Sequence, residues 1–445
     1  MIEACHSEHS EESPVLRSGQ HQMDSHKIND KQLFILSLLM VLGAVNSCAY
    51  TPAIPAISDF FHQPIYHTQL LVVISLLGHA IGPLLSVLFS NLISRLRSAS
   101  IGLMICMGAD LACIASWPLH HFSFLIVGIF LLSVGGNMSL STALTLVKDR
   151  YVFLLEKPLA LTTLAFAIFP GLFIFIASGI LDIAAWPAIF MAMGVFHGWL
   201  YWKIHACHSD SSLRWNDNKA EILCCHSRES GNPLACHSDS SLRWNDSEES
   251  PVRGLSFHIL KQKTFWLMAA LAGCFSGMLY SFSAFAPRIA MHELGASNIS
   301  FGLWSNLPSA GMIVGSLIAL QFLKKDWRKV LNYAIGFSII GILLLWTTLY
   351  FKLFNVFWFF TGVSIIYIGM QLAFPFLASQ ALNVPGDHAS KAAFFTILHF
   401  LIASQLVNLA NHLPFNSITN LLSIFVVCIV VISTIRFSFY FVAGK

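Results

Sequence analysis

One carboxylate, Asp110, lies well inside a long apolar stretch of the sequence, about two-thirds of the way along residues 98–117. A charged group at the centre of a bilayer costs at least about 2.5–3.5 kcal/mol on insertion scales, so an acid inside a membrane is a functional candidate by default. Its chemistry would be the binding and release of a proton. The structural alternative is a protonated or amide-paired acid on a peripheral helix, and it stays open at this point.

Histidines also occur within apolar stretches, at His79, His197 and His399. Imidazole titrates near neutral pH and can therefore carry protons. A lone histidine on an apolar helix is more often a hydrogen-bonded packing residue, and we choose only His79, near the middle of its stretch, to join Asp110 as a candidate for proton coupling. The sequence has no phosphate-binding loop and no nucleophile–base arrangement. It therefore predicts no enzyme, no catalytic residue and no cofactor.

The elements that must position these residues are membrane-spanning helices. With 56% apolar and only 11% charged residues, the 445-residue chain lacks the charge that covers a water-soluble globule. A bilayer core of about 30 Å takes roughly 20 helical residues, and a helix satisfies its own backbone at that depth. We predict an all-α membrane protein with spans near 33–57, 69–90, 98–117, 122–147, 158–181, 186–204, 264–287, 301–323, 330–351, 355–377, 391–411 and 417–438.

The positive charges predict how these helices are oriented. Of the 25 Lys and Arg residues, all but Arg288 and Lys352 fall on the two tails or on alternate joints between the stretches. Lys and Arg concentrate on the cytoplasmic side of membrane proteins, so both termini are predicted to be cytoplasmic. The first apolar run is too long for a signal peptide core and is expected to remain as the first span. The net charge of +3 follows from topology, and no nucleic-acid partner is expected.

The one long joint, residues 205–262, contains an exact internal repeat. The segment Ala206–Asp217 recurs letter for letter as Ala235–Asp246, and related pieces occur in the N-terminal tail. We interpret this as a recent insertion that is disordered, and we expect the ancestral protein to begin at Met23. The cysteines here could suggest zinc, but their adjacent Cys-His pairs lack the usual CxxC spacing, and no metal site is predicted.

The insertion divides the twelve predicted helices into two sets of six. The predicted organisation is a partly repeat-derived cytoplasmic tail, a six-helix bundle, a cytoplasmic linker, a second six-helix bundle and a short cytoplasmic tail, at residues 1–31, 32–204, 205–262, 263–438 and 439–445 respectively. Two similar bundles around a midplane site are typical of transporters that rock one half against the other.

Several motifs resemble one transporter family. The segment Tyr50–Ile57 (YTPAIPAI) resembles the Y-L-P-A-L-P-x-I end of the first helix in the bicyclomycin/chloramphenicol-resistance (Bcr/CflA) branch of the major facilitator superfamily. Residues within 69–82 and Trp186–Phe190 resemble the second helix and the start of the sixth helix of that branch. Residues 301–303 and 369–375 match more loosely. The resemblance implies the major facilitator fold and a drug-efflux transporter.

In this family, helices one, four, seven and ten line the substrate cavity. The resemblance therefore implies a cavity with uncharged aromatic and amide side chains, which suits an amphiphilic organic solute. The alternative is that the amides simply join neighbouring helices, at about 0.6 kcal/mol each on average. The candidate cavity residues are Asn46, Tyr50, Asn137, Tyr280, Tyr367 and Gln371.

The chain departs from the family at positions linked to coupling. The family's loop signature between helices two and three (G-x-x-x-D-R-x-G-R-[RK]) is reduced to Asn91, in place of the aspartate, and Arg95. Leu132 and Ile129 stand where the family has the fourth-helix Gln and Arg, and Cys48 replaces an acidic residue of the branch. The usual proton-coupling residues of the family are thus missing here.

Together these features predict a secondary transporter of a bacterial inner membrane. We expect it to export small amphiphilic compounds by proton antiport with alternating access, and to act as a monomer; its partners are the solute, protons and the lipid bilayer. Two alternatives stay open. One is an uptake carrier or facilitator for a metabolite, and the other is a decayed membrane protein that folds but no longer transports.

Overall fold

The computed structural model describes residues 30–90, 93–150, 156–209, 257–322, 326–385 and 388–443, and these residues are almost entirely helical. The second repeat, the first repeat beyond Ser209, the possible start at Met23 and the loop residue Asn91 lie outside them. The first half contains α2 (Asp30–Cys48), η1 (Thr51–Ala53), α3 (Ile54–Phe60), α4 (Ile65–Ser90), α5 (Arg95–Leu119), α6 (Phe122–Arg150), α7 (Glu156–Ile183) and α8 (Pro187–Ser209).

The second half repeats this plan with a short turn before its first long helix. It contains η4 (Phe257–Lys261), α10 (Lys263–Pro287), η5 (Arg288–Glu293), α11 (Asn298–Trp304), α12 (Asn306–Gln321), α13 (Trp327–Tyr350), α14 (Val356–Leu382), α15 (His388–His412) and α16 (Ser417–Ala443). Helix α8 thus extends to Ser209, and η4 begins at Phe257, inside the segment that the sequence predicted as a linker.

Two prolines interrupt the helix of the first span near its end. Helix α2 ends at Cys48, a 3₁₀ turn follows at Thr51–Ala53, and α3 continues to Phe60. Pro52 and Pro55 lie in the first turns of the two short segments, where a missing N–H costs no helical hydrogen bond. The span is therefore interrupted near one end, and Phe34–Phe60 still forms one stretch long enough to cross a membrane.

Eleven stretches of the described residues are long and apolar enough to cross a membrane, with α2–α3 and α11–α12 each forming one of them. The twelfth long helix, α8, has 23 residues but also carries His197, Trp199, Tyr201, Trp202 and Lys203, which lower its hydropathy. It packs against α5 within the same bundle. The prediction of an all-α membrane protein with two helical bundles is confirmed.

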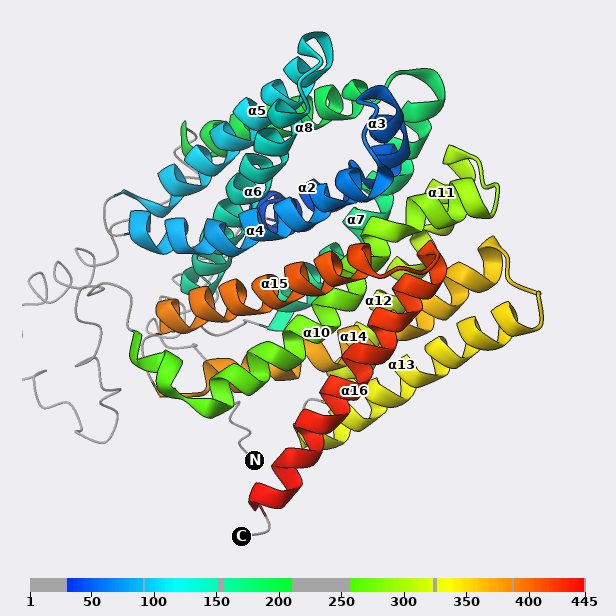
Figure 1. Cartoon of the computed structure of the whole chain (residues 1–445). Coiled ribbons are helices and arrows are strands. Elements are labelled where there is room, and N and C mark those ends of the chain that lie inside the picture. Colours follow the sequence, from blue (N-terminus) through cyan, green and yellow to red (C-terminus); the bar gives the residue numbers. More distant parts are fainter. Residues whose placement is uncertain are drawn as a thin grey trace, which may run out of the picture.

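Each half has its own apolar core. One core is built from residues between Ile35 and Ile204, and the other from residues between Ile259 and Ile432, joined by Ile54, Val72 and Leu76 of the first half. Helix α4 packs along α15, and α7 packs against α11 and α12, so these pairs form the contact between halves (Figure 1).

The two ends of the bundles differ. At one end, all the helices are joined by short connections around residues 61–64, 120–121, 184–186, 294–297, 351–355 and 413–416; we call this the short-loop end. Here Gln69 Nε2 donates to the Ala284 carbonyl at 3.2 Å, and Asn298 Nδ2 donates to Asp182 Oδ1 at 2.8 Å. Both hydrogen bonds join the two halves, which are therefore held together at this end.

Candidate functional site

Asp110 and His197 form a buried pair within the first half. Asp110 is on α5 and His197 is on α8, and His197 Nδ1 lies 2.6 Å from Asp110 Oδ2. The side chains are 1% and 0% exposed. Each supplies the polar partner that the other needs away from water, because an isolated buried charge or polar group is costly. The candidate Asp110 thus has a partner in the histidine that the sequence analysis treated as a packing residue.

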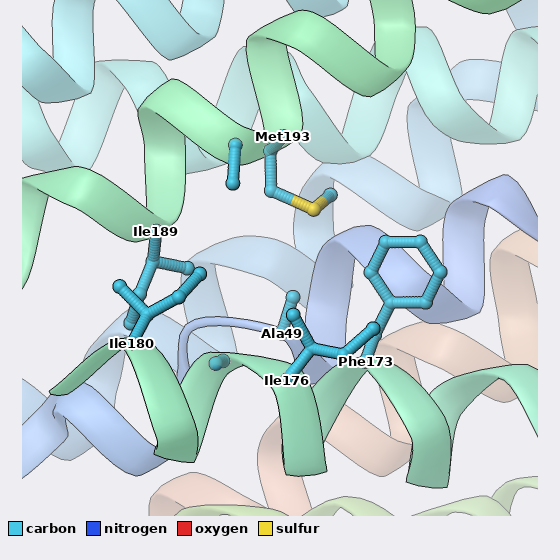
Figure 2. Close-up of a pocket in the computed structure, with 8 residues that line it drawn as sticks. Ala49, Phe173, Ile176, Ile180, Ile189 and Met193 are labelled. Carbon is cyan, nitrogen blue, oxygen red and sulfur yellow. The ribbon is translucent and has the colours of Figure 1, made fainter. Parts of the chain in front are cut away.

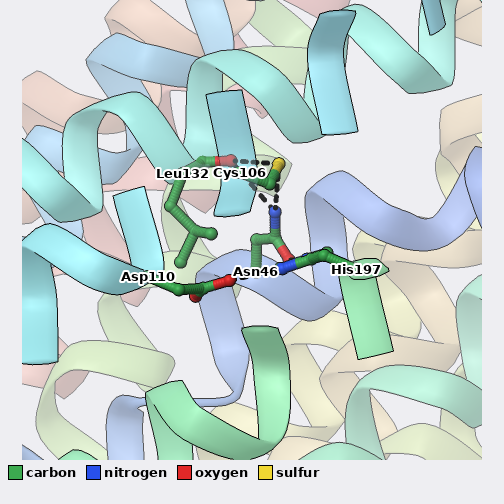
Figure 3. Close-up of polar contacts among 5 residues, drawn as sticks. All are labelled: Asn46, Cys106, Asp110, Leu132 and His197. Atoms are coloured by element: carbon green, nitrogen blue, oxygen red, sulfur yellow. Dashed lines mark hydrogen bonds and ion pairs between the residues drawn. The ribbon is translucent and has the colours of Figure 1, made fainter. Parts of the chain in front are cut away.

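Asn46 on α2 determines where the protons of this pair lie. Its Nδ2 donates to the Leu132 carbonyl on α6 at 2.9 Å and lies 3.5 Å from the Cys106 sulfur, so its Oδ1 faces His197 Nε2 at 3.1 Å (Figure 3). An amide oxygen only accepts, and His197 Nε2 must therefore carry hydrogen. These hydrogen-bonded side chains, which we call the polar chain, connect α5, α8, α2 and α6.

One shareable proton remains between His197 Nδ1 and Asp110 Oδ2. Either Asp110 is protonated and donates to Nδ1, or the imidazolium donates to the carboxylate; both arrangements have zero net charge. If that proton leaves, a net negative charge stays in the apolar bundle and a nitrogen lone pair faces an oxygen at 2.6 Å. The site can therefore hold one proton at low cost and can release it only when its packing or hydration changes.

The second carboxyl oxygen of Asp110 has no partner. Within the described part of the chain, Oδ1 is buried and makes no hydrogen bond. A carboxylate oxygen can accept up to two hydrogen bonds, so this atom is available to water or to a donor that enters the bundle. The pair therefore keeps an unused polar atom in an otherwise satisfied network.

Close helix packing allows the polar chain to form. A Cβ on Gly136 of α6 would lie 2.7 Å from Asn46 Nδ2 and 3.1 Å from Gly43 Cα, so the absence of a side chain lets α2 and α6 approach. A Cβ on Gly194 of α8 would lie 3.6 Å from Asp110, which is ordinary contact. Small residues at helix contacts are the usual way to bring polar groups of membrane helices within hydrogen-bond distance.

His79, the other proton-coupling candidate, lies elsewhere, at the contact between the halves. It is on α4, 1% exposed, and its ring centroid is 5.0 Å from that of Phe400 on α15 and 6.2 Å from that of Tyr280 on α10. Its ring nitrogens face the backbone carbonyls of Ser75 and Gly43. Asp110 and His79, the two residues that the sequence predicts for proton coupling, therefore do not form one site.

The candidate cavity residues are mostly engaged within the protein. Tyr50 donates its hydroxyl to the Leu71 carbonyl at 3.2 Å, and Tyr367 donates to the Leu279 carbonyl at 3.1 Å. Asn137 Nδ2 donates to the Ser133 carbonyl of its own helix at 3.2 Å, and the Tyr280 ring lies 6.0 Å from the Phe400 ring, tilted by 60°. Gln371 is half-buried against Gly315. Asn46 belongs to the Asp110–His197 chain and not to this group.

A separate apolar pocket lies between α7 and α8. It has a volume of about 200 Å³. Ile189, Met193 and Ile180 are among the side chains that face it, with Ala49 at the end of α2 (Figure 2). Because its lining is apolar, this pocket suits a hydrocarbon group and has no group for proton exchange.

The loop candidates are not placed. Asn91 lies outside the described residues, and Arg95 is described only as the first residue of α5. Among the described residues there is no cluster of three or more His, Cys, Asp or Glu side chains that could hold a metal ion.

His197 is the functional candidate that the sequence analysis did not choose. It is 87 residues from Asp110, and no spacing rule connects the two. The available signal was that a buried acid requires a partner, and that His197 lies in one of the few other spans with a titratable side chain.

The family model of the Major Facilitator Superfamily matches residues 33–406, and the chain therefore belongs to this superfamily of membrane transporters. The likeness to the Bcr/CflA branch remains a prediction. Solved structures with the same fold include the D-xylose–proton symporter, with 13% identity, a TM-score of 0.68, and coverage of 91% of this chain and 97% of that chain.

Two further matches have the same architecture. The inward-open xylose transporter XylE from E. coli has 12% identity, a TM-score of 0.66, and coverage of 91% of this chain and 95% of that chain. A bacterial homologue of the human lysosomal transporter Spinster, in an inward-facing conformation, has 13% identity, a TM-score of 0.63, and coverage of 92% and 96%. At these identities the matches show the fold alone, and the class of membrane transporter follows from the family match.

Proposed function

We propose that this chain is a proton-coupled secondary transporter that exports small amphiphilic organic compounds across a bacterial inner membrane. The observation that carries the proposal is the buried Asp110–His197 pair, which holds one shareable proton with zero net charge. Transporters of this superfamily bind small molecules and commonly couple to protons. A chain that lacks the family's usual coupling residues needs another group for this role, and the pair supplies one.

Proton exchange at the pair is linked to the packing of helices. Release of the proton leaves a negative charge in the apolar bundle, and this charge is costly unless α5 and α8 separate or water enters. Asn46 extends the link to α2, whose continuation in η1 contacts α10 in the other half. A change in protonation can therefore alter the packing of the helix that connects the pair to the contact between halves.

The chemistry of the contact between halves favours an amphiphilic solute over a sugar. Recognition of a sugar needs several free donors and acceptors, but Tyr50, Tyr367 and Asn137 already bond to backbone carbonyls. Besides the amide of Gln371, what remains is aromatic surface, including Tyr280 and Phe400, which suits planar or apolar groups. A substrate cavity at the contact between the halves would then bind solutes mainly by apolar contact.

Uptake by symport, or facilitated uptake, is the alternative within the class. It is favoured by Ile129 and Leu132, which stand in place of the fourth-helix Arg and Gln of drug-efflux relatives, and both side chains are buried. A protein that folds but no longer transports is the alternative from another class. Both predict that a lipophilic dye is not expelled.

Accumulation of a lipophilic cationic dye in pump-deficient bacteria tests the proposal. Cells expressing the chain should accumulate less dye, and an uncoupler should abolish the difference. Asp110→Asn can still donate to His197 Nδ1 but has no titratable proton, so it should fold and lose energised export. Asp182→Asn is the matched control, because this carboxylate is at the short-loop end and bonds to Asn298. It should retain export.

Each other outcome has a defined meaning. If Asp110→Asn keeps export that an uncoupler abolishes, proton coupling through the pair is wrong. Increased dye accumulation in cells that express the wild-type chain would favour uptake. If no gradient moves any tested solute while the protein is folded and abundant, the non-transporting alternative holds.

A further inference from the structure

His79 is held in a geometry that a neutral imidazole cannot satisfy. Its Nδ1 lies 2.8 Å from the Ser75 carbonyl oxygen on its own helix, and its Nε2 lies 3.0 Å from the Gly43 carbonyl oxygen on α2. Both partners are acceptors only. Neutral histidine carries one N–H, so either tautomer leaves a nitrogen lone pair facing an oxygen at hydrogen-bond distance. The imidazolium, with two N–H groups, satisfies both carbonyls.

His399 provides an internal comparison. Its Nδ1 lies 2.9 Å from the Phe395 carbonyl four residues earlier, the same local arrangement that His79 makes with Ser75. No second acceptor lies at hydrogen-bond distance from the ring of His399 among the described residues. The neutral Nδ1–H tautomer therefore suits His399 completely. The second acceptor, the Gly43 carbonyl, therefore distinguishes His79 from His399.

His79 also touches the other half of the molecule. The ring of Phe400 on α15 lies edge-to-face with it at 5.0 Å, within the range where a cation interacts with an aromatic ring. A charge on His79 would thus strengthen a contact within the first half, between α4 and α2, and a contact across the halves, between α4 and α15.

We propose that His79 is a second proton-binding residue, and that its charged form holds α4 against α2 and α15 in the conformation that is closed at the short-loop end. The inference rests on the proposed proton-coupled transport and assigns this residue the step that connects proton binding to the relative position of the halves. Asp110 and His197 hold a proton within one half, whereas His79 binds one where the halves meet.

The surroundings set limits on this charge. Of the described helices packed around His79, α10 faces it with Tyr280 and α15 with His399, and α2 faces it with the Gly43 carbonyl. No described carboxylate forms an ion pair with it. Burial disfavours a charged ring and the two carbonyls favour it, so proton binding and release should accompany the opening and closing of the α4–α15 contact.

Nitrogen-15 NMR of the full chain in lipid bilayers tests the protonation directly. Gly78–His79 is the only Gly-His dipeptide in the sequence, so carbonyl-labelled glycine combined with ¹⁵N-histidine selects His79 without any mutation. Between pH 8 and pH 5, His79 should pass from one protonated ring nitrogen to two. His399 should keep one protonated nitrogen until lower pH than His79. A His79 ring with one protonated nitrogen throughout this range would overturn the inference.

Transport then tests the consequence. His79→Gln cannot be charged but can still donate to one carbonyl, so the ratio of its transport rates at pH 6 and pH 8 should lie closer to 1 than that of the wild-type chain. His399→Gln should keep the wild-type ratio. If His79→Gln keeps that ratio, His79 does not couple the halves, even if it titrates. Because the NMR measurement needs no transport, failure of this inference and failure of export through Asp110 are distinguishable.

Discussion

Replacing His197 by Leu should destabilise the protein far more than loss of an ordinary interhelical hydrogen bond. The substitution leaves Asp110 Oδ2 and Asn46 Oδ1 without their partner, and both residues are 1% exposed. A buried polar atom left unsatisfied costs about 1–3 kcal/mol, so the two together cost about 2–6 kcal/mol. A typical side-chain hydrogen bond between membrane helices contributes about 0.6 kcal/mol. The destabilisation expected for His197→Leu is therefore large enough to distinguish from the loss of one such hydrogen bond.

A double-mutant cycle makes this prediction specific to the pair. Asp110→Val alone leaves His197 Nδ1 without its partner, at about 1–3 kcal/mol. The double variant leaves only Asn46 Oδ1 unsatisfied, and should also cost about 1–3 kcal/mol. The double variant should therefore be more stable than His197→Leu alone, whereas independent sites would add to about 3–9 kcal/mol.

The assay is equilibrium unfolding of the purified protein in mixed micelles, followed by circular dichroism as denaturing detergent is added. His399→Leu is the control, since among the described residues that ring bonds to a single acceptor, a carbonyl of its own helix. It should cost less than about 1 kcal/mol. Equal destabilisation by His197→Leu and His399→Leu, or additivity in the cycle, would refute the pairing.

Two further predictions concern glycines where helices approach closely. Gly136→Ala places a methyl group 2.7 Å from the Asn46 amide and should destabilise by about 1–3 kcal/mol in the same unfolding assay, whereas Gly194→Ala, with contacts at 3.6 Å, should stay within about 0.5 kcal/mol. Gly302→Ala at the short-loop end places a methyl group 2.7 Å from an α7 side chain of the other half, so amide hydrogen exchange of α7 and α11 should increase. Gly179→Ala, which meets nothing within 4 Å, should leave exchange unchanged; equal exchange in both variants would contradict a closed contact there.

The sequence determined the class of this protein because the relevant signals are local. Apolar length, the scarcity of charge and the backbone's need for internal hydrogen bonds each act within one segment, so helices and spans can be predicted one at a time. Pro52 and Pro55 likewise interrupt the first span without any distant partner, because each lacks a backbone N–H. Motifs such as Tyr50–Ile57 added the superfamily, which the family match also supports.

Only part of the candidate site could be predicted from the sequence. Asp110 and His79 could be chosen because a polar group in an apolar span is unusual in itself. Their partners could not, since His197 is 87 residues from Asp110 and the Gly43 carbonyl is a backbone atom that no residue type marks. Asn46 carries an amide that suits a cavity equally well, and only its neighbours show that it orients His197.

Tertiary packing therefore decided which polar groups share a proton and which meet across the halves. Those relationships depend on the rotation and approach of whole helices, down to the space left by single glycines such as Gly136. The sequence alone sets how many helices there are, what they are made of and that they belong in a membrane. The contacts that bring Asp110 to His197, and His79 to Gly43 and Phe400, exist only once the helices are packed, because each joins atoms that no local rule connects.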